Sequence, residues 1–231
     1  MARKLCAEFI GALLLAACVI GSGIMAERMA GGNAAVALLA NTLATVAVIA
    51  ALISSLGPIS GAHFNPVVTI AAIGLRRLDP ALGAAYVITQ MAGCCAGAML
   101  ANAMFELPLI APSMHARSGA AQWLSEVVAT VGLVLVAFRA ASFREAAWRV
   151  ALWIGAAYWF TASTSFANPA VTVARALSDT FAGIRPIDVP GFVLAQFVGA
   201  TVATLLFRWL VPALPETASD IVMPRSEPIR P

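Results

Sequence analysis

Two short stretches that each contain an Asn-Pro pair constrain the fold of this chain more than any other feature. Residues 60–69 read SGAHFNPVVT, and residues 165–172 read SFANPAVT. Asn is a favoured N-cap, and Pro suits the first helical position, where its missing N–H costs no hydrogen bond. Each pair therefore predicts a loop that turns abruptly into a helix. Both helices are apolar and are expected to end about three turns later, near residues 73–74 and 176–177.

The composition places these two helices in a membrane. The chain has 231 residues, of which 61% are hydrophobic and only 11% are charged, and its mean hydropathy is +0.90. A soluble domain carries about 25% charged residues, so the sequence predicts an integral membrane protein of the all-α class. Crossing a bilayer takes roughly 20 residues, which makes the two Asn-Pro helices half-helices. The positive dipole ends of such half-helices build a polar site inside an apolar slab.

Six longer apolar segments are predicted to span the membrane, and the fifth of them is short. They cover about residues 5–25, 34–56, 81–103, 123–138, 147–163 and 191–211. One re-entrant half-helix follows the second span and the other follows the fifth. The last stretch, residues 212–231, holds five prolines among scattered charges and is predicted to be a disordered tail of a single channel domain.

The same order of motifs occurs twice. Glu8 opens the first span and Glu126 the fourth, while a Gln-x-x-Gly begins at Gln90 in the third span and at Gln196 in the sixth. The two repeats cover about residues 5–103 and 121–211. Three spans per repeat is an odd number, so the halves must insert with opposite topology, as an inverted repeat. The two Asn-Pro ends are then expected to meet near mid-bilayer.

The distribution of Lys and Arg predicts the orientation, because cytoplasmic loops carry an excess of both. With six spans, ten basic residues fall on the side of the N-terminus and four on the other side. The sequence therefore predicts an inner-membrane protein with both termini in the cytoplasm. The ten are Arg3, Lys4, Arg76, Arg77, Arg139, Arg144, Arg149, Arg208, Arg225 and Arg230, and the four are Arg28, Arg117, Arg175 and Arg185.

With these motifs the chain resembles the aquaporin (major intrinsic protein) family over about residues 5 to 211. The resemblance implies a passive channel for water or small uncharged solutes, with one pore per subunit of a homotetramer. It also assigns roles to residues: Glu8 and Glu126 accept hydrogen bonds from loop N–H groups, and His63 lines the pore near its cytoplasmic side. The pore motifs are Asn65, Pro66 and Val67 in the first repeat and Asn168, Pro169 and Ala170 in the second.

The residues themselves support a channel. Asn65 and Asn168 would each cap a half-helix and direct an amide N–H into the pore, where a permeating hydroxyl accepts from both. Two positive helix ends at one point raise an electrostatic barrier to cations and protons.

The chain departs from the family at the selectivity filter. In most of the family an Arg follows the second Asn-Pro-Ala, and here that position is Val171. Counting back from each Asn without gaps puts the other filter positions on Thr45, Ala156 and Ser165. All four are small and uncharged, which predicts a wide, weakly polar filter. It favours glycerol, urea or undissociated metalloid acids, and it resembles the bacterial aquaporin-like channels that carry arsenous acid.

Arg175 is a candidate replacement for the missing filter arginine. It lies four residues after Val171, one turn and ~6 Å further along the same helix face. Helical side chains lean toward the N-terminus, so its guanidinium would reach the level of Val171. The alternatives are an ion pair with Asp179 and simple snorkelling to the membrane interface.

Other functions remain open at this stage. Within the family, the alternatives are a glycerol or polyol facilitator and a plain water channel. A coupled secondary transporter would need carboxylates facing its substrate path, and only Glu8 and Glu126 are available. An enzyme is the weakest alternative because no catalytic set is evident. No cofactor, bound metal or nucleic-acid partner is predicted, and the cysteines, all within apolar segments, are predicted to be small core residues: Cys6, Cys18, Cys94 and Cys95.

Overall fold

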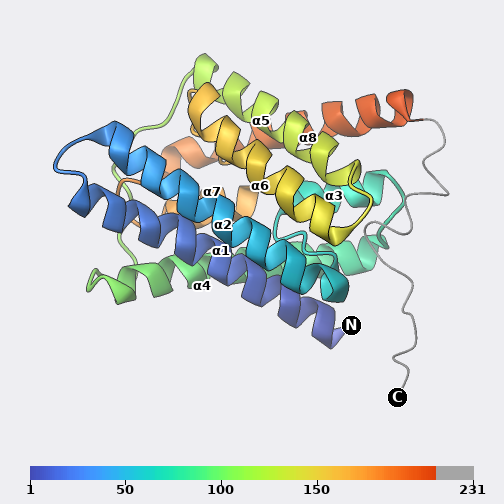
Figure 1. Ribbon diagram of the computed structural model, residues 1–231, viewed down its shortest axis with the longest axis horizontal. Coiled ribbons are helices and arrows are strands. Elements are labelled where there is room, and N and C mark those ends of the chain that lie inside the picture. Colours follow the sequence, from blue (N-terminus) through green and yellow to red (C-terminus); the bar gives the residue numbers. More distant parts are fainter. Residues whose placement is uncertain (212–231) are drawn as a thin grey trace.

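The computed structural model describes residues 1–211, and over this range the chain is helical without strands. The predicted all-α architecture of six long helices and two half-helices is confirmed (Figure 1). The predicted tail, 212–231, lies outside the described residues. The long helices are α1 (Ala2–Met29), α2 (Ala34–Ser60), α4 (Pro80–Met104), α5 (Ala120–Phe138), α6 (Phe143–Phe160) and α8 (Val189–Leu210); the short ones are α3 (Pro66–Gly74) and α7 (Pro169–Arg175), and a 3₁₀ turn, η1 (Pro186–Asp188), precedes α8.

The long helices run back and forth between two ends of the molecule (Figure 1). The N-terminus, the turns at 75–79 and 139–142 and the end of α8 lie at one end, which we call the N-terminal side. The turn at 30–33 and the loops 105–119 and 176–188 lie at the other, which we call the long-loop side. The chain after α2 re-enters from the N-terminal side and α3 returns to it, whereas the chain after α6 re-enters from the long-loop side and α7 returns there.

Two boundaries differ from the sequence prediction for local reasons. Helix α6 begins at Phe143 instead of near residue 147, because the side chain of Ser142 caps it by accepting a hydrogen bond from Glu145 N (3.1 Å). Helix α7 has only seven residues and ends at Arg175. Five long helices are apolar and long enough to cross a membrane by themselves; α6 is less apolar because Arg144, Glu145 and Arg149 occupy its first two turns.

Close helix crossings within each repeat depend on glycine. A Cβ placed on Gly97 of α4 would lie 2.2 Å from the carbonyl oxygen of Leu13 in α1, and one on Gly199 of α8 would lie 2.7 Å from that of Val127 in α5. Small residues are favoured where membrane helices approach this closely. The equivalent crossings α1–α4 and α5–α8 therefore form the two halves of the bundle.

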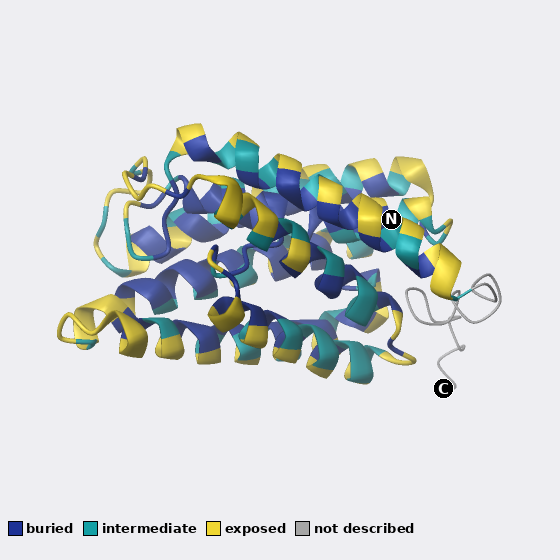
Figure 2. Cartoon of the chain, turned by 90° about the horizontal axis from the view of Figure 1, so that it is seen from above, coloured by how far each residue is buried: buried dark blue, intermediate teal, exposed yellow. Residues whose placement is uncertain are grey.

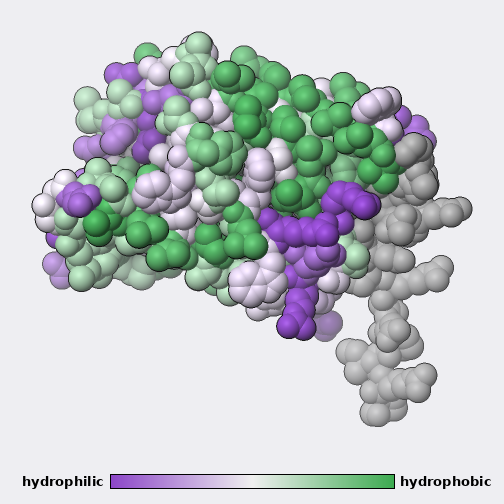
Figure 3. Space-filling view, turned by 45° about the horizontal axis from the view of Figure 1, so that its top comes forward, coloured by the Kyte–Doolittle hydropathy of each residue, from purple (hydrophilic) through white to green (hydrophobic). Residues whose placement is uncertain are grey.

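The buried residues face the space between the two halves (Figure 2). Hydrophobic residues cover much of the face seen in Figure 3. Large apolar side chains on the surface include Ile88, Leu152 and Leu194, which are 71%, 61% and 66% exposed. An apolar surface of this extent is expected where lipid replaces water as the surrounding medium.

Candidate functional site

The first re-entrant loop is held by Glu8 of α1, whose side chain is fully buried. Its carboxylate accepts hydrogen bonds from the backbone N–H groups of His63 (3.0 Å) and Phe64 (2.8 Å). It also accepts from Ser60 Oγ and from Gln90 Nε2, both at 2.7 Å. Four donors compensate the cost of burying the charge, so the loop that leads to α3 is fixed to α1 and α4.

The second repeat builds the same arrangement around Glu126 of α5. Its carboxylate accepts from the N–H groups of Phe166 and Ala167, both at 2.8 Å, and from Ser163 Oγ and Gln196 Nε2, both at 2.6 Å. The sequence marks the Glu and Gln positions as repeated. It does not show that each Gln is the hydrogen-bond partner of the Glu in its own repeat, because the two residues lie about 70–80 positions apart.

Both loops contain left-handed residues at equivalent positions. Ala62 and Phe64 have φ of +50° and +49°, and Ser165 and Ala167 have φ of +51° and +46°. These residues stand three and one positions before each Asn. A left-handed non-glycine residue costs about 1–2 kcal/mol, and such strain gathers at functional sites. The carboxylate hydrogen bonds described above supply the compensation.

Asn65 and Asn168 cap α3 and α7. Oδ1 of Asn65 accepts from the N–H of Val67, and Oδ1 of Asn168 accepts from that of Ala170, both at 3.0 Å. Each Asn is followed by a proline, Pro66 or Pro169, at the start of the helix.

The amide nitrogen of each Asn reaches across to the other repeat. Nδ2 of Asn65 donates to the carbonyl oxygen of Ala167 (2.8 Å), and Nδ2 of Asn168 donates to that of Phe64 (2.9 Å). The N-termini of α3 and α7 therefore face each other at the centre of the molecule, where a reciprocal pair of hydrogen bonds joins them.

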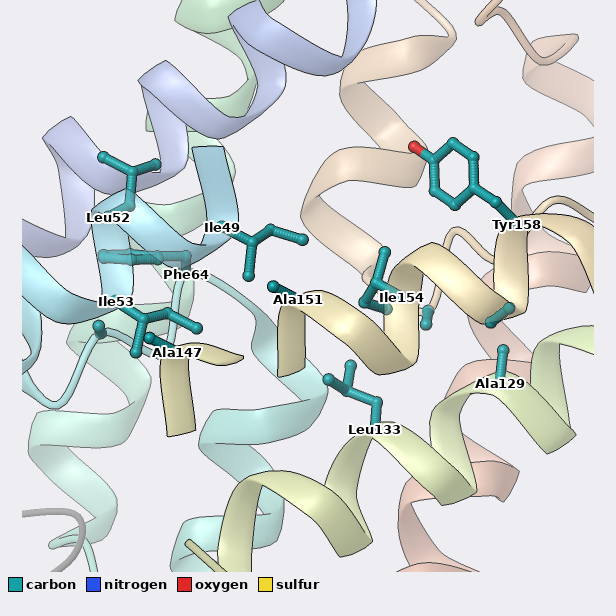
Figure 4. Packing of buried hydrophobic residues seen from close by; sticks show 13 residues of the cluster. Ile49, Leu52, Ile53, Phe64, Ala129, Leu133, Ala147, Ala151, Ile154 and Tyr158 are labelled. Carbon is teal, nitrogen blue, oxygen red and sulfur yellow. The ribbon is translucent and has the colours of Figure 1, made fainter. Parts of the chain in front are cut away.

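A cavity runs beside this centre. Both asparagines, His63 and Ser165 line it, and apolar side chains of α2, α5 and α6 supply much of its wall, several of which are drawn in Figure 4. Nε2 of His63 and Oγ of Ser165 have no hydrogen-bond partner among the described residues. Buried polar groups are normally paired, so these two are available to a molecule inside the cavity. The arrangement offers a few polar contacts along an otherwise apolar passage.

Three of the four predicted filter residues line the cavity, and the fourth does not. Thr45, Ser165 and Val171 belong to its wall, whereas Ala156 is exposed on the outside of α6. The ungapped count from Asn168 thus gives the wrong face of α6. Tyr158 takes the position inside the cavity and was missed. A tyrosine within a membrane segment is itself a signal, since a buried hydroxyl needs a partner.

Arg175 also lines the cavity, one turn beyond Val171. It is 2% exposed, its Nε donates to the carbonyl oxygen of Ala182, and its Cζ lies 3.4 Å from the centre of the Phe166 ring. Among the described residues it forms no ion pair with Asp179, whose Oδ1 accepts from Met114 N at 2.8 Å. Burial also rules out snorkelling for Arg175.

A second buried arginine, Arg117, lies near the same ring. Its Cζ is 5.1 Å from the centre of Phe166, and its Nε donates to the carbonyl oxygen of Gly183 (2.8 Å). Its terminal nitrogens donate to the carbonyl oxygens of Ser163 and Phe181, both at 3.4 Å, and Asp188 accepts from its backbone N–H (2.8 Å). From the sequence alone, Arg117 enters only the count of Lys and Arg that predicts the orientation. Two guanidinium groups therefore lie over the same Phe166 ring, and the Arg175 group is the one that lines the cavity.

The part of the chain that the structure covers contains no group of three or more His, Cys, Asp or Glu residues able to hold a metal ion. All four cysteines are free; Cys94 is buried, Cys18 and Cys95 are partly buried, and Cys6 is exposed.

Comparisons with known proteins agree with this geometry. The family model described as Major intrinsic protein matches residues 1–147 and 138–227. Aquaglyceroporin AqpS of Rhizobium meliloti (strain 1021) is 53% identical over 218 residues, which are 93% of each chain. Aquaporin-2 of Rattus norvegicus is 26% identical over 90% of this chain and 79% of its own. The X-ray structure of the aquaglyceroporin from Plasmodium falciparum superimposes with a TM-score of 0.69 at 18% identity, over 92% of this chain and 98% of that one.

Proposed function

Because the chain belongs to the major intrinsic protein family and is a passive membrane channel for small uncharged solutes, we propose that solutes cross through the cavity between the two repeats. The observation that carries the proposal is the central pair of capped half-helices, with Asn65 and Asn168 both in the cavity wall. The whole chain then serves as one channel domain.

The asparagines provide the central contact for a solute. Each Asn amide has two N–H donors, and one of them is used by the carbonyl of the opposite loop. The second is available to a solute hydroxyl. The two helix N-termini add positive potential at the same level, which opposes the passage of cations and protons. A neutral molecule with hydroxyl groups replaces its hydrogen bonds to water by hydrogen bonds to these asparagine N–H groups. It carries no charge, so the positive potential does not oppose its passage.

We propose that the solutes include glycerol and neutral metalloid acids such as arsenous acid, besides water. Thr45, Ser165 and Val171 are small, and none carries a charge, which leaves more room than an arginine at position 171 would. The name of the relative from R. meliloti, an aquaglyceroporin, agrees with the glycerol part of this proposal. Arg175 supplies the positive charge at the level where Val171 lacks it.

The coupled-transporter alternative finds no support in the acidic residues. Glu8 and Glu126 are fully buried, hold the two loops, and are absent from the cavity wall among the described residues. Neither is placed to exchange a proton or ion with a passing solute. The comparison proteins are named as channels, and we propose that this chain has no enzymatic activity.

The test is stopped-flow light scattering on proteoliposomes with water, glycerol and arsenous acid, for wild type and Val171→Arg. We expect the wild type to pass all three. The variant should retain water flux and lose the larger solutes, because the guanidinium would occupy space in the cavity that Val171 leaves free. A wild type that passes only water would contradict the proposed solute class.

Two further features of the assembly are proposed with this function. The channel forms a homotetramer with one pore per subunit, in line with the family resemblance. It lies in the inner membrane with the N-terminal side in the cytoplasm, because eight described Lys and Arg residues belong to that side and four to the other. The eight are Arg3, Lys4, Arg76, Arg77, Arg139, Arg144, Arg149 and Arg208.

A further inference from the structure

We infer that Arg77 is the docking site for the carboxylate of Glu216, so that the segment after α8 is held at the N-terminal side of the channel. This segment is residues 212–231, which follow the described part of the chain. The inference goes beyond the proposed function, because it concerns a contact of the chain with itself and holds whichever neutral solutes pass.

Arg77 is placed by the turn that ends α3. Its backbone N–H donates to the carbonyl oxygen of Ala72 (2.8 Å), and that of Arg76 donates to the carbonyl oxygen of Ile73 (2.9 Å). Arg76 has a φ of +58°. Two such bonds around a left-handed residue form the Schellman motif of a helix C-terminus. The main chain of Arg77 is therefore fixed relative to α3.

Two aromatic rings hold the guanidinium of Arg77. Its Cζ atom lies 5.1 Å from the centre of the Phe138 ring and 5.8 Å from that of the Phe207 ring. The two rings contact each other edge to face, with their centres 6.4 Å apart, and both are buried. Arginine stacks on aromatic faces and keeps its donors in the plane of the group. The guanidinium is thus positioned where the ends of α3, α5 and α8 meet.

The nitrogens of this guanidinium lack an acceptor. Nε and both terminal nitrogens of Arg77 are buried, although the residue as a whole is partly exposed, and none has a hydrogen-bond partner among the described residues. Both ion pairs between described residues involve other side chains. Asp79, the acidic residue nearest in sequence, caps α4 by accepting from Leu82 N (3.0 Å).

The charge of Arg77 is retained at neutral pH. Burial lowers the pKa of its guanidinium to about 10, which leaves the group protonated at neutral pH. A buried charge without a partner is costly, and an anion with hydrogen-bond acceptors removes that cost. The geometry of the site therefore favours a carboxylate or another anion as its occupant.

The segment that begins at residue 212 starts beside this site. Val211, the last described residue, packs against the same cluster of buried residues as Phe138 and Phe207. The ends of α3 and α8 also lie at the same end of the molecule (Figure 1). Glu216 follows Val211 by five residues, a span of up to about 17 Å. Its carboxylate is therefore within reach of Arg77.

The charge of the segment suits the site. Residues 212–224 contain two acidic residues, Glu216 and Asp220, and no Lys or Arg. The N-terminal side is otherwise basic. An arginine matches a carboxylate with two parallel N–H···O bonds. Of the two acids, Glu216 is nearer to α8 along the chain, and the shorter connection gives it the higher effective concentration at Arg77.

Docking holds the segment beside the cavity. Phe138 contacts Arg77 and also belongs to the cavity wall, together with Ala137 and with Phe143 at the start of α6. The docking site and the passage thus share one ring. A segment held at Arg77 lies next to the mouth of the passage on the N-terminal side.

The experiment follows the segment with a nitroxide spin label on Ala218→Cys, in a background whose four native cysteines are replaced by alanine. Electron paramagnetic resonance in nanodiscs of neutral phosphatidylcholine separates immobilised from mobile label. We expect an immobilised component. Arg77→Ala and Glu216→Gln should each lower the ratio of immobilised to mobile label about tenfold, because each removes the charge-assisted hydrogen bonds. The double variant should lower it no further than either single variant.

Two variants are matched controls. Arg76→Ala removes an exposed arginine of the same turn, and Asp220→Asn removes the other acid of residues 212–224. Both should leave the ratio unchanged.

A label that is fully mobile in the parent protein would overturn the inference, as would a ratio that either Arg77→Ala or Glu216→Gln leaves unchanged. An equal fall in a control variant would also contradict it, since the effect would then reflect only net charge. A parent protein with a mobile label that retains phosphatidylglycerol through purification, when Arg77→Ala does not, would assign the site to a lipid phosphate instead. If Arg77→Ala is not recovered as folded protein, Glu216→Gln decides by the same criterion.

Discussion

We propose that Val171 and Arg175 divide between them what one filter arginine does in most of the family. The small valine lines the cavity together with Ser165, and the arginine one turn later places its charge over the ring of Phe166. Stacking on an aromatic ring and donating to a backbone carbonyl are both features that suit arginine better than lysine. In this proposal, the width and the charge of the filter are set by two different residues.

Replacing Arg175 separates these two properties. Arg175→Ala should raise proton and Na⁺ leakage through the channel about tenfold, which corresponds to about 1.4 kcal/mol of lost barrier. Glycerol flux should be retained or increased. The leak is measured with a pH-sensitive or Na⁺-sensitive dye inside proteoliposomes.

Two variants control the leak experiment. Arg175→Lys keeps the charge and should retain most of the barrier. Arg185→Ala removes a partly exposed arginine on the same side, which pairs with Asp188 (Nε to Oδ2, 2.9 Å), and should leave the leak unchanged. If Arg175→Ala altered neither cation leak nor solute flux, the role given to this charge would be wrong.

The filter positions on α2, on the second re-entrant loop and on α7 followed from the sequence better than the position on α6. Thr45, Ser165 and Val171 line the cavity where a count from the asparagines puts them. The count lands on Ala156, two residues before the cavity-lining Tyr158, and because each residue turns the helix by about 100°, such a shift puts the side chain on a different face. A fixed residue count from Asn168 does not tell which side of α6 faces the cavity. The hydroxyl of Tyr158 is a better guide, because a buried hydroxyl needs a hydrogen-bond partner.

At the scale of the helices, glycines allow neighbouring helices to approach each other closely. Gly97→Ala should destabilise the protein by about 1–3 kcal/mol, because its Cβ would meet the carbonyl oxygen of Leu13 and α4 would have to move away from α1. The measurement is thermal unfolding of the purified protein in detergent.

Gly21→Ala is the matched control for this change. A Cβ there would meet its nearest neighbour, the ring of Phe105, at 3.4 Å, which is an ordinary contact. Because alanine favours the helix by about 0.5–1 kcal/mol over glycine, Gly21→Ala should be neutral or stabilising. Equal destabilisation by both substitutions would show that backbone approach is not the reason for Gly97.

The half-helices were predictable because their start signals are local. Asn followed by Pro gives the cap and the first turn at both sites. The ends of the half-helices were harder to predict. Helix α7 ends at Arg175, whose side chain donates a hydrogen bond to the carbonyl oxygen of Ala182 in the loop that follows. Helix propensities do not predict such a contact, because it joins the end of the helix to a residue in the following loop. The hydrogen bonds of Glu8 and Glu126 to the loops likewise depend on packing between distant segments.

At the scale of the whole molecule, the charges predict one orientation. A fluorescent protein that folds only in the cytoplasm, fused after residue 231, should be fluorescent. Alkaline phosphatase fused after residue 112, in the loop 105–119, should be active because it is exported. The reason is the excess of Lys and Arg on the N-terminal side. The opposite pattern of the two reporters would contradict the proposed topology.

The reciprocal bonds between Asn65 and Ala167 and between Asn168 and Phe64 also bear on how the protein is made. A growing chain has synthesised α1 to α4 long before residue 167 exists, so the first repeat then lacks the partners of its own centre. In a bilayer, unpaired amide and carbonyl groups are costly. Closure of the centre is therefore expected late in biogenesis, once the second repeat inserts. By the same reasoning, an ancestor with a single repeat would have worked only as a pair of identical chains inserted in opposite directions.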